Sequence, residues 1–259
     1  MKHAIHIALA AALVSLPHFA MAAADDYVTF SAGAEATTGK YGGTERTNIY
    51  YVPFTGKYET GLWTYKLTVP YVSVTAPSNA VVIDAEGGQV ISATGPRHTD
   101  SGLGDVVASA FYTALNPAKA SLGIDLGVKV KFGTADHAKG LGTGENDYSL
   151  QADLYKRFGA FTPFGTIGYR WYGDPPEVNL LNAFFGTVGG TYRISQSRTA
   201  GLAYDFRDPI VAGGGRVSEL TAYFSQYYSK NWKLQVYTIA GFANASPDFG
   251  AGATLSYTY

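Results

Sequence analysis

The chain has 259 residues, with 19 basic and 20 acidic side chains, 31 glycines, 20 tyrosines, 14 phenylalanines and no cysteine. The balanced charge excludes a strongly basic nucleic-acid-binding protein, and the lack of cysteine excludes disulfide scaffolds and thiolate metal sites. Few charges combined with many aromatic residues and glycines are typical of a membrane β-barrel with aromatic girdles.

Residues 1–22 have the pattern of a secretory signal peptide. A lysine supplies the positive charge, an apolar run extends over 4–16, and Ala-Met-Ala at 20–22 is a small-x-small cleavage site. Cleavage after Ala24 is an alternative. The apolar run is shorter than the roughly 20 residues that a spanning helix needs. We therefore predict an exported mature chain, 23–259, that forms one domain.

Twelve segments of the mature chain alternate between apolar and polar residues with a period of two, which predicts β-strands. The connections after the second, fourth, sixth, eighth and tenth segments are short, and most of the others are longer, as in outer-membrane barrels. With an even strand number, both termini lie on the short-turn, periplasmic rim. In chain order the segments are 27–37, 44–54, 58–75, 101–114, 121–133, 146–158, 161–172, 181–194, 198–208, 216–228, 232–243 and 249–259.

The segment 121–133 shows the alternation most clearly. Its apolar parity runs from Leu122 to Phe132, and its other parity carries Asp125 and Lys129. A soluble β-sandwich alternates in the same way, so parity alone leaves open which face meets water. The loop asymmetry, and tryptophans at both predicted rims, favour an all-β, antiparallel transmembrane β-barrel with up-and-down topology. Its apolar face meets lipid and its polar face encloses the lumen.

The second segment follows the same rule. It places Ile49 and Tyr51 on the lipid side, opposite Arg46 on the lumen side. Clusters of turn-forming residues predict a turn at 55–57 and a long extracellular loop at 76–100.

The final segment carries Phe249, Leu255, Tyr257 and Tyr259 on one face, so that the chain stops on an aromatic residue. This pattern resembles the C-terminal signal strand of outer-membrane barrels. The resemblance implies two partners, the outer-membrane assembly machinery and the lipid of the bacterial outer membrane.

Four glycine-rich motifs are similar to those of a known family. They are SGLGDV at 101–106, KFGT at 131–134, LGTG at 141–144 and GYR at 168–170. The family is the outer-membrane proteins of the meta-pathway of phenol degradation, and the resemblance is clearest over 101–172. It implies an outer-membrane channel or uptake protein for aromatic or other poorly soluble compounds.

We expect neither enzymatic activity nor a cofactor. The mature chain has two histidines, His98 and His137, both in predicted loops, whereas a barrel lipase needs a Ser–His pair near the membrane boundary. The adjacent Asp136 and His137 are too few to fill the coordination shell of a metal. The sequence GLGTG at 140–144 lacks the lysine and the helix of a nucleotide-binding loop.

The lumen-facing charges form the candidate site. A twelve-stranded barrel lies between eight-stranded barrels filled by side chains and open porins of about 16 strands. In one interpretation the charges pair across strands and seal the interior. In the other, Lys129, Lys131, Arg157 and Arg170 form a constriction that passes small anionic solutes. The pore-lining candidates are Lys66, Asp105, Asp125, Lys129, Lys131, Asp153, Arg157, Arg170 and Arg207.

The function that we expect is passive or facilitated transport of small molecules, including hydrophobic or aromatic compounds, across the outer membrane. One alternative is a structural or adhesive barrel that acts through the loop at 76–100. The other alternative is a soluble periplasmic β-protein. Nucleic acid is not an expected partner.

Overall fold

The computed structural model describes residues 26–78, 80–84, 89–91, 95–116, 122–176 and 178–259, so the predicted signal peptide lies outside the described residues. No helix in these ranges is long and apolar enough to cross a membrane. The described elements are β1 (Tyr27–Gly39), β2 (Thr47–Thr60), β3 (Trp63–Pro77), β4 (Val81–Asp84), β5 (Gln89–Ile91), β6 (Arg97–Leu103), β7 (Val106–Leu115), β8 (Leu122–Phe132), a short 3-10 helix η1 (His137–Lys139), β9 (Asp147–Lys156), β10 (Phe161–Trp171), β11 (Ala183–Arg193), β12 (Arg198–Arg207), β13 (Val217–Tyr227), β14 (Trp232–Gly241) and β15 (Phe249–Thr258).

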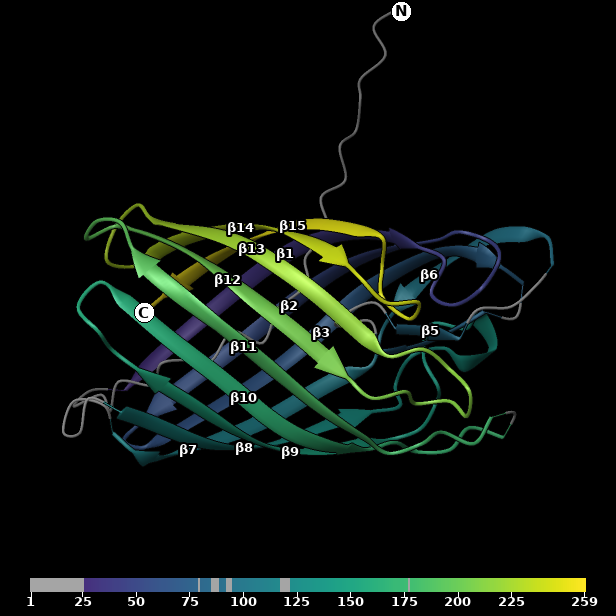
Figure 1. Cartoon of the computed structure of the whole chain (residues 1–259), viewed down its shortest axis with the longest axis horizontal. Helices are drawn as coiled ribbons and strands as arrows, with labels where there is room; N and C mark the ends of the chain where they lie inside the picture. Colours follow the sequence, from purple (N-terminus) through teal and green to yellow (C-terminus); the bar gives the residue numbers. More distant parts are fainter. Residues whose placement is uncertain (1–25, 79, 85–88, 92–94, 117–121, 177) are drawn as a thin grey trace, which may run out of the picture.

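Thirteen of these strands form one antiparallel sheet that closes on itself (Figure 1). Strand β2 pairs with both β1 and β3, which closes the sheet into a barrel. Among the strand pairings of the described residues, β6 is joined to β3 alone. Strands β6 and β7 pair with opposite ends of β3 and together form one interrupted barrel strand. Counted as one, they make a barrel of twelve strands, which confirms the predicted fold and strand number.

The two rims of the barrel differ in the length of their connections, as predicted. Both ends of the barrel chain lie at the short-turn rim, where β1 pairs with β15. In Figure 1 the short turns are on the left and the long loops on the right. Short turns span 61–62, 157–160, 194–197 and 228–231, and longer loops span 133–146, 172–182 and 208–216.

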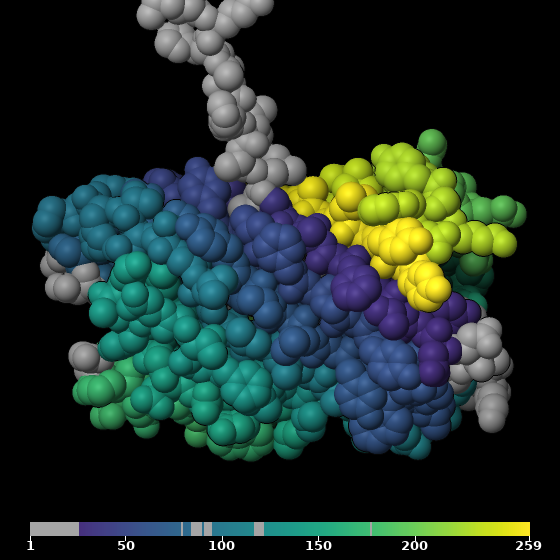
Figure 2. All heavy atoms as spheres, turned by 180° about the vertical axis from the view of Figure 1, so that it is seen from behind, coloured from purple at the N-terminus to yellow at the C-terminus, as the bar shows by residue number. Residues whose placement is uncertain are grey.

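The barrel is closed by a seam between its first and last strands. In Figure 2, β15 in yellow lies beside β1 in purple. Thr29 of β1 lies opposite Thr258 of β15, and their hydroxyl oxygens are 3.0 Å apart. The next inward pair, Ser31 and Ser256, is joined by a hydroxyl hydrogen bond of 2.9 Å. The seam is therefore bonded through both backbone and side chains.

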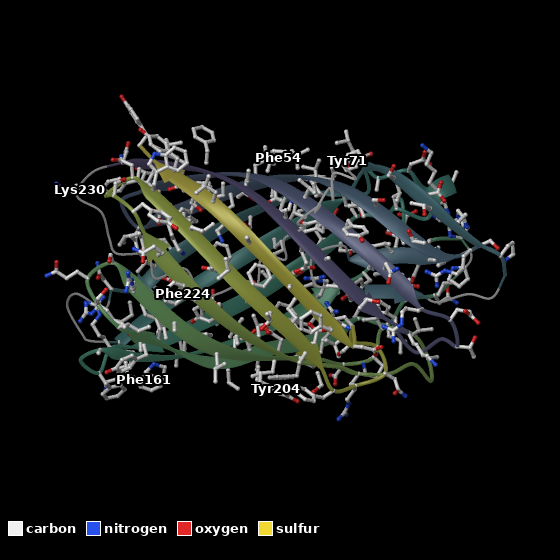
Figure 3. All side chains as sticks on the ribbon, turned by 90° about the horizontal axis from the view of Figure 1, so that it is seen from above. Phe54, Tyr71, Phe161, Tyr204, Phe224 and Lys230 are labelled. Carbon is white, nitrogen blue, oxygen red and sulfur yellow. The ribbon has the colours of Figure 1, made fainter. Side chains whose placement is uncertain are left out.

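The orientation of the strand faces agrees with the prediction. Phe54 and Tyr71 on one side, and Phe161 and Tyr204 on another, project away from the barrel (Figure 3). Leu126, on the apolar parity of β8, is also exposed, whereas its neighbour Asp125 is buried inside. A contiguous apolar outer surface of this extent suits hydrocarbon rather than water.

Exposed tryptophans mark both rims. Trp63 and Trp232 begin β3 and β14 at the short-turn rim, and Trp171 ends β10 at the long-loop rim. Each packs against a tyrosine, such as Tyr257 beside Trp232 with ring centroids 4.9 Å apart. Amphipathic rings at two levels are expected where a barrel crosses the two headgroup regions.

Both predictions for the second strand are wrong. The predicted turn at 55–57 lies inside β2, and the chain turns instead at Gly61, whose φ is 55°, and Leu62. Ile49 and Tyr51 point inward and are buried, because loops that fold into the barrel supply apolar partners for them. Arg46 is not on a strand; it precedes β2 and pairs with Asp248 at 2.8 Å.

The predicted fourth strand, 101–114, is interrupted between β6 and β7. Thr68 of β3 lies opposite Val107, and Tyr71 lies opposite Leu103. Two residues of β3 therefore face the three residues 104–106, which is the geometry of a β-bulge. Because of the bulge, Asp105 leaves the regular strand pattern and turns toward the loops at the mouth.

Candidate functional site

Aromatic rings on the inner wall lie over glycines of the neighbouring strands. In each pair the two residues are directly opposite in the strand register, and a Cβ atom on the glycine would overlap the ring. Glycine thus provides the space that lets a large ring lie along the wall. The pairs are Phe111 with Gly127, Tyr155 with Gly123, Phe164 with Gly189, Phe185 with Gly168, and Tyr223 with Gly201.

The variant Gly127→Ala is expected to lower the stability of the folded barrel by about 1–3 kcal/mol, because its methyl group displaces the Phe111 ring. The temperature at which the folded gel band converts to the unfolded band measures this change. Gly165→Ala is the control, since its methyl group would meet Thr187 O at an ordinary 3.6 Å. Equal transition temperatures for the two variants would contradict the packing argument, and Phe111→Leu should rescue Gly127→Ala.

A row of basic side chains crosses the inner wall diagonally, and we call it the basic row. Lys57 lies directly opposite Lys66, and one serine separates each later pair of basic residues along successive strand pairs. The order across β2, β3, β7, β8, β9 and β10 is Lys57, Lys66, Ser109, Lys129, Ser149 and Arg170. Since strands are tilted, the row rises from the short-turn half of the barrel to the long-loop rim.

A second row, the acidic row, runs beside it on β8 to β13. Asp125 lies opposite Asp153, and Asp205 lies opposite Glu219. Threonine hydroxyls fill the positions between these two pairs and donate to the carboxylates, at 2.5 Å from Thr166 to Asp153 and at 2.6 Å from Thr187 to Asp205. Asp153 and Asp205 are therefore bonded within the wall.

Lys131 is the centre of a buried network at the long-loop end of the barrel. Its Nζ lies 3.2 Å from Asp105 Oδ2 and 2.9 Å from Asp147 Oδ2. It also donates to the carbonyl oxygen of Ile83 in β4 at 3.1 Å and to Thr143 Oγ1 at 3.3 Å. One ammonium group thus connects the wall with two inward-folded segments.

The two carboxylates of this network bind further loops. Asp105 Oδ1 accepts a hydrogen bond from the backbone N–H of Ala135 at 2.9 Å. Asp147 Oδ1 accepts one from the N–H of Gly173 at 3.1 Å. The loops 133–146 and 172–182 are consequently fixed to the same cluster of charges.

Strand β4 lies across the mouth of the barrel. Val82 and Ile83 are each 1% exposed and, as neighbours on a strand, point to opposite sides. Val82 joins an apolar cluster with Ile49 of β2, and Ile83 joins one with Ala183 of β11. Strand β11 is six strands from β2 in either direction around the barrel. A segment that joins the apolar clusters of both sides therefore lies across the mouth.

Loop residues complete the packing on each side of β4. The N–H of Val82 donates to Gly140 O at 2.9 Å, and Leu141 lies in the same cluster as Val82. Tyr41 also belongs to that cluster and donates its hydroxyl proton to Thr37 at 2.9 Å. Burial raises the pKa of the Tyr41 phenol above its ordinary value, which reinforces the neutral form that donates this hydrogen bond.

The predicted site residues fall into separate groups. Lys66, Lys129, Asp125 and Asp153 line the wall below the mouth, and Lys131 and Asp105 belong to the mouth network. The remaining three, Arg157, Arg170 and Arg207, lie near the rims.

Arg170 and Arg207 lie near the long-loop ends of β10 and β12, and Arg157 is exposed in the short turn 157–160 at the opposite rim. Arg157 therefore does not meet Lys131 and Arg170 in one ring. Sequence reasoning missed Lys57, which it placed in a turn. The alternation of Thr55, Lys57 and Glu59 with apolar neighbours could have identified it.

The described residues contain no group of three or more His, Asp or Glu side chains arranged to hold a metal. His98 Nε2 lies 2.6 Å from Asp100 Oδ2 at the mouth, and His137 Nδ1 lies 3.3 Å from Gly142 O. The partner of His98 is a carboxylate, whereas a nucleophilic dyad requires a hydroxyl.

Comparisons with known proteins support the architecture. An outer membrane channel from Pseudomonas putida F1 is 14% identical, with a TM-score of 0.67, over 94% of this chain and 100% of that chain. NanC porin is 9% identical, with a TM-score of 0.54, over 89% and 98%. KdgM porin is 12% identical, with a TM-score of 0.51, over 89% and 99%. No family model and no curated protein matches the sequence. The likeness shows the fold, a closed β-barrel of the bacterial outer membrane.

Proposed function

We propose that the protein is an outer-membrane channel for small molecules. The observation that carries the proposal is a closed barrel with an apolar outer surface and a charged, hydroxyl-rich inner wall. Polar side chains along a lumen stabilise solutes and water that the surrounding hydrocarbon excludes. The similarity to solved channels over nearly the full length of both chains supports the same function.

Planar-bilayer recording of the purified, folded protein tests this proposal. We expect discrete conductance steps, which are small because β4 occupies the mouth. Conductance that stays absent, even in a variant in which an Asn-Gly turn replaces residues 79–95, would reject the channel. Heat-modifiable gel mobility and recovery in the outer-membrane fraction would separately reject the soluble periplasmic alternative.

We propose further that the solutes are hydrophobic or aromatic compounds. We also propose that the chain belongs to the meta-pathway family. Two features support this part of the proposal: the similar motifs at 101–172 and the aromatic rings along the inner wall, such as Phe111 and Phe185. Liposome swelling with phenyl glucoside and methyl glucoside tests the preference, because both solutes are neutral. A slower entry of the phenyl compound would count against it.

The adhesive alternative has less support. It requires the loop at 76–100 to be presented outside the cell, yet Val82 and Ile83 of this loop are buried in the mouth. The same loop also contributes β6 to the barrel wall.

A further inference from the structure

We propose that the lumen binds small monovalent organic anions and passes them along the basic row. This inference rests on the channel function and adds a charge preference to it. Three features of the lumen support it: the continuity of the basic row, the difference in accessibility between the two rows, and the aromatic surroundings of the cations.

The basic row is continuous along the barrel. Neighbouring strands are about 4.8 Å apart, so Lys66 and Lys129, which are two strands apart, are separated by about 10 Å. Ser109 lies between them, and Ser149 lies between Lys129 and Arg170. Ammonium and hydroxyl groups both donate hydrogen bonds to a carboxylate. An anion can thus exchange donors step by step from one rim toward the other.

The acidic row does not present an equivalent path for cations. Asp125, Asp153 and Glu219 are 2%, 3% and 7% exposed and Asp205 is half-buried, whereas Lys57, Lys66 and Lys129 are all half-buried. At the ends of the basic row, Arg170 is 8% exposed and Lys57 forms an ion pair with Glu59 at 2.6 Å, so Lys66 and Lys129 are its most accessible cations. Asp153 interacts electrostatically with Lys66 and Lys129 and offsets part of their charge. Because Asp153 is buried and bonded to Thr166, a solute in the lumen meets the ammonium groups of Lys66 and Lys129 before this carboxylate.

Aromatic faces accompany the cations of the row. Lys66 Nζ lies 5.3 Å from the centre of the Phe111 ring, and the Arg170 guanidinium lies 5.6 Å from the ring centres of Tyr172 and Phe185. A cation next to an apolar ring suits a solute that carries one acid group on an apolar body. This pairing selects organic anions over fully hydrated inorganic ones.

Ion selectivity of Lys66→Gln/Lys129→Gln tests the proposal. Reversal potentials are measured in gradients of KCl and of potassium benzoate at about 0.1 M, where the Debye length is about 10 Å. The wild type should prefer both anions over K⁺ several-fold, with benzoate above chloride relative to their mobilities in water. The double variant should lose most of this preference, and Lys66→Arg/Lys129→Arg should keep it. The control is Lys156→Gln/Lys230→Gln, which removes the same charge from exposed positions near the short-turn rim.

The outcomes separate this inference from the proposed function. Conductance steps without anion preference, or a preference that survives in the double Gln variant, would overturn the basic row and leave the channel intact. A complete absence of steps in the wild type and in the variant lacking 79–95 would instead reject both. Heat-modifiable mobility of every variant shows that the compared barrels are folded.

Discussion

Replacing residues 79–95 by an Asn-Gly turn is expected to raise the single-channel conductance several-fold. Val82 and Ile83 lie within the deleted segment and fill the centre of the mouth. The deletion leaves the wall intact, because β3 and β6 are already paired at Pro77 and Arg97 and the N–H of Ser78 donates to Pro96 O at 3.0 Å. A two-residue turn is the favoured connection between antiparallel strands at this separation.

Two variants with smaller changes test whether β4 is the cause of the low conductance. Val82→Ala/Ile83→Ala keeps the chain length and should produce larger or more variable steps than the wild type, though smaller than those of the deletion. Val211→Ala removes apolar volume beside the Ile83 cluster without altering β4, and it should leave the conductance nearly unchanged. An unchanged conductance after the full deletion would show that β4 is not the main barrier.

Lys131→Met is expected to destabilise the barrel by about 3–5 kcal/mol, since it leaves Asp105 and Asp147 buried without their shared ammonium partner. The same change releases the hydrogen bond to Ile83 O, so β4 should be held less firmly. The stability is measured from the midpoint of urea unfolding in lipid vesicles, and tryptophan fluorescence is the signal that follows the unfolding.

A neutral version of the network is the matched control for Lys131→Met. Lys131→Met/Asp105→Asn/Asp147→Asn removes the buried charges together and should recover much of the lost stability. If the triple variant is no more stable than the single one, the loss does not arise from uncompensated carboxylates. Lys129→Met, two residues away on the same face, should cost far less because Lys129 is half-buried.

The barrel itself could be predicted because its signals are local. Period-two alternation identifies most of the strands, and in β8 the exposed Leu126 and the buried Asp125 follow it. Connection lengths then determined which rim is which. These properties depend only on neighbouring residues and on the solvent at each face.

The contents of the mouth could not be predicted in this way. Ile49 and Tyr51 are apolar residues on the inner face, and only the inward fold of distant loops makes that position favourable. The segment around Val82 is rich in turn-forming residues, which predicts an exposed loop. Gly56 likewise led to the prediction of a turn at 55–57, yet it lies on the outer face of β2, which continues through it.

Lys129 and Lys131 show why the roles of individual site residues could not be predicted from the sequence. They are the same residue type on the same face of β8, yet Lys129 belongs to the basic row and Lys131 holds the mouth network. The difference arises from the strand register, the β-bulge that redirects Asp105, and the position of Ile83 O. None of these is encoded by spacing along the chain alone.

The seam between β1 and β15 has a consequence for biogenesis. The first strand to leave the ribosome pairs with the last, as in the contact of Thr29 with Thr258. Until β15 is in place the sheet has two open edges and the barrel cannot close. Such long sequence separation also makes folding slow. A chain that stops before Phe249 should therefore be degraded or aggregate, whereas a circular permutant opened within one of the short turns should still assemble.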